Sequence, residues 1–320
     1  MSIATELDRR LALPVIAAPL FLVSGPELVI NCCKEGVLGT FPSLNLRSTA
    51  AFEGWLVQIR DALAAHDAAN PARKSAPYGV NIIAHKTNTR LDEDMALVEK
   101  YKVPLVITSV GNPGEIVKTV HSYGGLVFHD VTTPEWAKKA ITTGVDGIIL
   151  VCGGAGGHAG IINPFAFVPQ VREFYDGVVA LAGCISDGRA VHAAQALGAD
   201  FAYMGTKFIA AAESMAGDPY KQMLIEAGPT DLVYTPAFSG IPANMLRQSI
   251  IDNGMDPDTL PTKDHIDLGE EFSHEAKAWR DIWTAGQGVG SIHDIQPVRQ
   301  MIDQLKQEYH EARNSRQRAA

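Results

Sequence analysis

The stretch Val145–Gly160, VDGIILVCGGAGGHAG, decides the fold that we predict for this chain. It contains an unbroken apolar run, Ile148–Val151, which follows a glycine and is too short for a buried helix. Such a run is typical of a parallel strand that is covered on both faces. Glycines follow the run, and Gly156 and Gly157 directly precede His158. Because glycine lets the backbone approach a flat ligand and histidine exchanges protons near pH 7, we expect a catalytic site at this strand end.

Outward from this strand, short apolar runs alternate with helical patterns in both directions. We expect eight strands separated by seven helices, with the strands at 14–19, 36–40, 78–83, 105–109, 126–130, 148–151, 178–183 and 201–204. This count predicts an α/β fold of the (β/α)8 TIM barrel type, with its chemistry at the carboxyl ends of the strands. A doubly wound open sheet would place the same residues at the same strand ends, so it stays open as an alternative.

The alternation stops after about residue 212. The following segment contains six prolines between helical stretches such as 220–227. We therefore expect three parts. Residues 1–212 form the barrel, 213–284 form a smaller, mainly helical insertion domain that caps the substrate site, and 285–320 return to the barrel and end in a helix.

Composition narrows the class of protein. The 320 residues carry a net charge of −9 without a basic stripe, which argues against a nucleic-acid partner. The four cysteines form no CxxC pair or metal-like spacing, which favours a reducing cytoplasm and no metal site. The chain shows no signal peptide and no stretch of 18 apolar residues, so we expect no membrane association. Pairing of two copies through the insertion stays open.

Two further glycine-containing loops end the seventh and eighth strands, LAGCISDG at 181–188 and YMGTKF at 203–208. In barrels these two loops and a following helix N-terminus commonly bind a phosphate group. The expected donors are backbone N–H groups, with one added hydroxyl from Thr206. They belong to Gly183, Cys184, Gly205 and Thr206. Beside a flat ligand we expect small or amide-bearing residues, namely Ala18, Pro19, Asn81 and Gln287.

In these motifs the chain resembles the nitronate monooxygenase family of FMN-dependent barrel enzymes. The resemblance covers nearly the whole chain. It is carried by AAP at 17–19, GVN at 79–81, GNPG at 111–114, AGGHAG at 155–160, DGR at 187–189, GADFAYMGTKF at 198–208 and AGQG at 285–288.

The resemblance implies FMN as cofactor and His158 as the catalytic residue, with the four backbone donors binding the FMN phosphate and Asn81 and Gln287 contacting the flavin. FMN is expected rather than FAD because the chain has no separate dinucleotide motif. The implied reaction oxidises small alkyl nitronates with O2 to carbonyl compounds and nitrite. We place Ser109, Asp130 and Phe238 in the substrate pocket, and we expect residues 238–244 (FSGIPAN) of the insertion to close it from above.

Alternatives remain for the reaction. Many family members carry an acidic residue where this chain has Gly154, so we expect extra room at the end of the sixth strand. Such room would suit an FMN-dependent NAD(P)H oxidoreductase that acts on an enoyl thioester, a quinone or a ring-containing acid. A non-enzymatic FMN-binding or sensor module is the third possibility, and the protic His158 argues against it.

Overall fold

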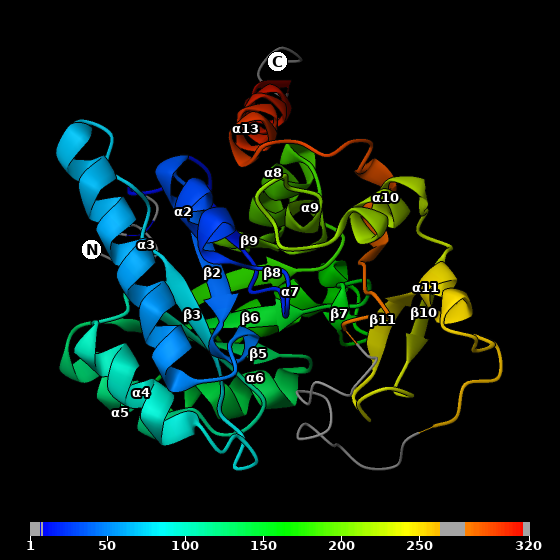
Figure 1. Ribbon diagram of the computed structural model, residues 1–320, viewed down its shortest axis with the longest axis horizontal. Coiled ribbons are helices and arrows are strands. Elements are labelled where there is room, and N and C mark those ends of the chain that lie inside the picture. Colours follow the sequence, from blue (N-terminus) through cyan, green and yellow to red (C-terminus); the bar gives the residue numbers. More distant parts are fainter. Residues whose placement is uncertain (1–6, 8, 263–278, 316–320) are drawn as a thin grey trace.

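The computed structural model describes residues 7, 9–262 and 279–315. At its centre, eight parallel strands form a closed barrel (Figure 1). Strand β1 pairs in parallel with both β2 and β9, which closes the ring and excludes the open sheet. The predicted TIM barrel is therefore confirmed. The strands are β1 (Val15–Ala17), β2 (Leu38–Pro42), β3 (Gly79–Ile83), β4 (Leu105–Ser109), β5 (Leu126–Val131), β6 (Gly147–Val151), β8 (Val178–Ala182) and β9 (Phe201–Met204).

Helices surround the barrel, and short local signals set their ends. The N-cap side chains Ser48, Thr133, Asn163 and Asp187 each accept a hydrogen bond from the first turn of their helices. Gly198 ends α8 in the left-handed conformation, at φ +117°. The outer helices are α2 (Pro26–Lys34), α3 (Thr49–Ala69), α4 (Leu91–Lys100), α5 (Gly114–Ser122), α6 (Pro134–Ile141), α7 (Pro164–Arg172), α8 (Gly188–Leu197) and α13 (Val298–Ser315).

The barrel interior is filled by apolar side chains, among them Ile16, Ile107, Phe128, Ile149 and Phe201, which are buried against one another. A second and larger cluster packs the outer faces of the strands against the helices. Because the interior is solid, a ligand can enter only at an end of the barrel.

The last helix, α13, packs against α8 and α2 and completes the outer ring (Figure 1). The approach of α13 to α8 is close, because a Cβ on Gly188 would lie 2.2 Å from the carbonyl oxygen of Leu305. The Glu308 carboxylate accepts a hydrogen bond of 2.8 Å from the Gly188 amide. Acidic side chains from both helices thus lie at the N-terminus of α8.

Residues 213–262 and 279–284, which we call the capping segment, lie beside the carboxyl ends of the barrel strands (Figure 1). They contain α10 (Asp218–Glu226), β10 (Leu232–Thr235), β11 (Ala243–Leu246) and α11 (Arg247–Asp252). The sequence predicts a mainly helical segment here and does not predict the hairpin β10–β11 that lies between the two helices. Strand β11 also pairs with β7 (Gly157–His158), which gives a three-stranded sheet. Residues 263–278 of the expected insertion lie outside the described residues, as do 1–6, 8 and 316–320 of the expected terminal parts.

None of the helices in the described ranges is long and apolar enough to cross a membrane. Within the same ranges, no group of three or more His, Cys, Asp or Glu side chains is placed to hold a metal ion.

Candidate active site

A cavity of about 1280 Å³ lies at the carboxyl ends of the barrel strands. It brings together most of the site residues that the sequence predicts, drawn from six strand ends and from β7. These residues are Ala18, Pro19, Asn81, Ser109, Asp130, Gly156, Gly157, His158, Gly183, Cys184, Gly205 and Thr206.

The His158 side chain is positioned by the capping segment. Strand β7 pairs antiparallel with β11, with Ala243 opposite His158. The Nε2 atom of His158 lies 2.9 Å from the Ser239 hydroxyl oxygen. The Trp279 ring packs edge-on against the imidazole, with 5.0 Å between the ring centroids. The imidazole is therefore held from two sides at the wall of the cavity.

The glycine-rich loop around His158 is fixed in the same way. Asn244 donates a side-chain hydrogen bond of 2.7 Å to the carbonyl oxygen of Ala155, and Tyr234 donates one of 2.9 Å to that of Ala159. The Ala159 amide donates to the carbonyl oxygen of Pro242. Sequence reasoning missed Tyr234. Ser239 and Asn244 lie in residues 238–244, which the sequence predicts to close the pocket, although the sequence does not indicate their contacts. Ser239 is 81 positions from His158, and no local pattern connects the two.

Gly154 does not create the extra room that its small size suggested. Its backbone has φ +82°, and an added Cβ would lie 2.6 Å from the Cys184 Sγ and 2.7 Å from the Gln287 Oε1. Those two side chains occupy the space that a side chain at position 154 would need. The expectation of a widened strand end is wrong.

The backbone N–H groups predicted to bind phosphate lie together at the ends of β8 and β9. Gly183 has φ +124° and Cys184 has φ +59°, a pair of left-handed residues that turns the chain sharply after β8. Within the described residues, the amides of Gly183, Cys184, Gly205 and Thr206 donate no hydrogen bond in turns, loops or caps. Neighbouring N–H groups of this kind suit an anion.

The surroundings of these four amides, which we call the phosphate cradle, refine the predicted binding of an anion. The Thr206 hydroxyl oxygen accepts a hydrogen bond of 2.9 Å from the Gly286 amide, so its proton can still be donated to an anion. The N-terminus of α8, by contrast, is satisfied by Asp187 and Glu308. An anion in the cradle would therefore be bound by loop amides and by the start of the short helix α9 (Thr206–Ile209), without help from α8.

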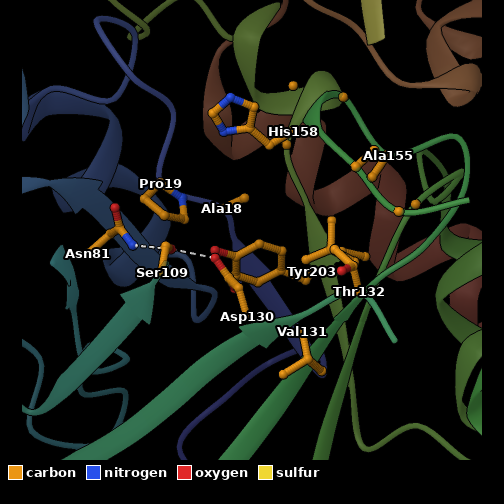
Figure 2. Close-up of a pocket in the computed structure, with 18 of the residues that line it drawn as sticks. Ala18, Pro19, Asn81, Ser109, Asp130, Val131, Thr132, Ala155, His158 and Tyr203 are labelled. Carbon is orange, nitrogen blue, oxygen red and sulfur yellow. Dashed lines mark hydrogen bonds between the residues drawn. The ribbon is translucent and has the colours of Figure 1, made fainter. Parts of the chain in front are cut away.

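On the opposite wall, side chains from three adjacent strands form a hydrogen-bonded chain (Figure 2). The Asn81 amide of β3 donates to the Ser109 hydroxyl of β4 at 2.7 Å. Ser109 in turn donates to the Oδ2 atom of Asp130 on β5 at 2.5 Å. We call this chain the polar wall. Its geometry depends on the register of three parallel strands.

Burial changes the acidity of the groups on this wall. Burial raises the pKa of Asp130 to about 6, although the Ser109 hydrogen bond lowers it. Tyr203 of β9 lies beside Asp130, and its pKa is raised by burial and by the carboxylate charge. His129 instead contacts the Thr108 hydroxyl at 2.7 Å, and burial lowers its pKa to about 4. At neutral pH, Asp130 is thus the group on this wall that is closest to titration.

Comparison with known proteins places the chain in a family. The family model described as nitronate monooxygenase matches residues 7–308. The chain belongs to the nitronate monooxygenase family.

The similar proteins are distant. The chain is 26% identical to a nitronate monooxygenase of Paraburkholderia phytofirmans, over 92% of each chain. It is 26% identical to a (3aS,4S,5R,7aS)-5-hydroxy-7a-methyl-1-oxo-octahydro-1H-indene-4-carboxyl-CoA dehydrogenase of Rhodococcus jostii over 75% of this chain, but it spans only 64% of that relative. FabK from Thermotoga maritima has a similar structure, with a TM-score of 0.80, 26% identity, and coverage of 100% of this chain and 99% of that one. Like its relatives, this family member is an oxidoreductase.

Two predicted site residues of this nitronate monooxygenase family member do not line the cavity. The Gln287 amide donates to the carbonyl oxygen of Gly154, and its side chain contacts Cys184 at 3.7 Å from an exposed position. Phe238 packs beside the small apolar cluster that contains Met245 and Ile250, so its position does not fit the predicted pocket role. Its place at the cavity is taken by Ile241 and Pro242, three and four residues further along the chain.

Proposed function

We propose that the protein is an FMN-dependent oxidoreductase that oxidises alkyl nitronates with O2 to carbonyl compounds and nitrite. One observation carries the proposal. A cradle of backbone amides that donate to no turn, loop or cap of the described residues lines the same cavity as an oriented His158. The cradle suits a phosphate, and His158 lies where a second ligand could be bound.

The residues of the cavity fit FMN. The amides of Gly183, Cys184, Gly205 and Thr206 would hold its phosphate, while Ala18, Pro19 and Asn81 would flank the flat ring system. The volume of about 1280 Å³ exceeds the 300–1,000 Å³ or so of a site for one drug-sized ligand, which leaves room for a substrate as well. When bound, FMN supplies the electron transfer between the substrate and O2.

In this proposal His158 binds the nitro-group oxygens of the substrate. An imidazole can donate a hydrogen bond or a proton to them, or take the proton from a neutral nitroalkane. Ser239 and Trp279 hold the ring, so that little orientational freedom is lost when the substrate binds. We further propose that the capping segment closes this end of the barrel and shapes its specificity.

A second candidate is an FMN-dependent NAD(P)H oxidoreductase or dehydrogenase that acts on a larger substrate, such as a thioester. The size of the cavity favours it, because a small nitronate fills little of the space beside a flavin. One of the similar proteins is also named as a dehydrogenase of a CoA derivative.

Anaerobic mixing of the purified holoenzyme separates the two candidates. We expect propyl-1- or propyl-2-nitronate to bleach the flavin absorbance at once and to be turned over in air, with NADH and NADPH reacting slowly. Rapid bleaching by NADH or NADPH without nitronate turnover would favour the second candidate. Release of FAD, or of no flavin, from the denatured protein would refute the cofactor.

A further inference from the structure

The Asp130 carboxyl group has one oxygen in use and one without a partner. Its Oδ2 atom accepts the Ser109 hydrogen bond. Its Oδ1 atom is buried, and among the described residues it has no hydrogen-bond partner. A buried polar atom without a partner costs free energy, unless a ligand supplies the missing bond. Asp130 also lines the cavity, so a molecule bound against this wall lies beside the carboxyl group that lacks this bond.

The groups around Asp130 indicate in which protonation state it forms this hydrogen bond. From β3 and β4 it faces the neutral Asn81 and Ser109, and from β9 it faces Tyr203, whose raised pKa keeps it a neutral phenol. On its own strand, His129 is turned to Thr108 and is neutral at pH 7. His158 lies across the cavity in Figure 2. None of these neighbours contributes a cation that lowers the Asp130 pKa.

We propose that Asp130 contacts the bound flavin as a neutral acid, with its Oδ1 hydroxyl donating a hydrogen bond to the heterocyclic edge of the ring system. Ser109 and Asn81 are positioning residues that hold the other carboxyl oxygen. This inference rests on the proposed binding of FMN.

Two arguments favour the neutral form. A ring system seated in the cavity removes water from the carboxyl group, which disfavours its charge further. The pyrimidine edge of a flavin also presents several acceptors, two carbonyl oxygens and unprotonated ring nitrogens, against one N–H donor. Because burial already raises the pKa of Asp130 to about 6, a further rise caused by the bound ring system keeps the carboxyl group protonated at neutral pH.

Proton uptake on flavin binding is the measurable consequence. If the complex holds a proton that the free protein has lost, flavin affinity must fall as the pH rises, by up to tenfold per pH unit above the pKa of free Asp130. At pH 7 we expect net uptake of protons, at most one per flavin.

The test uses the full-length protein, stripped of flavin and titrated calorimetrically at pH 7 in two buffers with different ionisation enthalpies. Both FMN and riboflavin are used, because the FMN phosphate titrates near pH 6 and riboflavin lacks it. Wild type should take up protons with both ligands, whereas Asp130→Asn should bind riboflavin without uptake and with a pH-independent affinity. Ser109→Ala should move the affinity profile of the wild type to higher pH, because the carboxylate loses a donor. Asp176→Asn, a change at an exposed position before β8, is the matched control and should behave as wild type.

The wild-type titration with riboflavin decides the matter even if a variant fails to fold. Tight binding without proton uptake, or with proton release, overturns the role of Asp130 and leaves the FMN proposal intact. Failure of the stripped wild type to bind FMN at all overturns both.

Discussion

The two walls of the cavity recognise a ligand by different means. The wall built by the loops after β6, β8 and β9, which we call the glycine wall, consists largely of backbone. It includes left-handed residues such as Gly154, Gly157 and Gly183. The polar wall after β3, β4 and β5 consists of side chains that are linked by hydrogen bonds.

This contrast determines where the chain tolerates substitution. On the glycine wall an N–H group binds whatever side chain the residue carries, so substitutions act mainly through shape and backbone strain. On the polar wall, a substitution of similar size changes which groups can donate or accept a proton, and it leaves the shape of the cavity intact. His158 is the exception on the glycine wall, because there the side chain itself performs the chemistry.

We expect the largest effect from replacing the His158 side chain. His158→Asn keeps much of the side-chain volume but cannot exchange a proton near neutral pH. We expect FMN binding to persist and nitronate turnover to fall by about 10²- to 10⁴-fold, the usual range for acid–base catalysis. Ser239→Ala should cost only a few-fold, because Ser239 orients the ring. Steady-state kinetics of flavin-loaded variants provide the measurement, and a wild-type rate in His158→Asn would remove the catalytic role.

A large effect is also expected from a side chain added to the glycine wall. Gly183→Val places a β-branched residue at φ +124°, a strained conformation that costs about 1–3 kcal/mol, and crowds the phosphate cradle. FMN affinity, measured by quenching of flavin fluorescence, should fall on the order of 100-fold, because the branched side chain crowds the bound phosphate and a loop that relaxes its strain moves the amides out of place. Gly54→Ala in α3 is the matched control, since its Cβ meets nothing within 4 Å and should stabilise the helix slightly. Unchanged affinity in Gly183→Val would argue against phosphate binding here.

Asp130 on the polar wall should make the free energy of unfolding depend on pH. The pKa of Asp130 is raised from 3.8 to about 6 in the folded protein, which corresponds to about 3 kcal/mol. Because the folded pKa is the higher one, this contribution is present below pH 4 and is lost as the pH rises through 6. Relative to Asp130→Asn, flavin-free wild type should therefore lose up to about 3 kcal/mol of unfolding free energy between pH 4 and pH 7. Urea unfolding at several pH values tests this, and parallel curves would contradict it.

The smallest effect should come from Cys184, which lies on the glycine wall. Cys184→Ala should leave FMN affinity within about twofold of wild type, because the backbone N–H, not the thiol, is the proposed donor. Cys184→Gly should raise the unfolding free energy by about 1 kcal/mol, since φ +59° is costly for a residue with a Cβ. Equilibrium binding and thermal unfolding measure the two effects. Loss of flavin in Cys184→Ala would show that the side chain matters.

Much of the fold was predictable from the sequence. The expected strands at 105–109 and 201–204 coincide with β4 and β9, because compact apolar runs bounded by turn residues are a local signal. The hairpin β10–β11 was missed, since its strands are four residues long and are separated by a proline-containing loop. Pro236 and Pro242 in that loop indicated irregular structure more strongly than the flanking residues indicated strands.

The amino-acid sequence specifies the alternation of strands and helices and the order in which glycines and polar residues end the strands. These properties follow from local periodicity and from residue types that each strand end carries separately. Tertiary structure alone decided how those ends meet. The register of β3, β4 and β5 joins Asn81 to Asp130 through Ser109. The pairing of β7 with β11 orients His158. Contacts between segments so far apart in the chain depend on how the barrel closes, which no local pattern encodes.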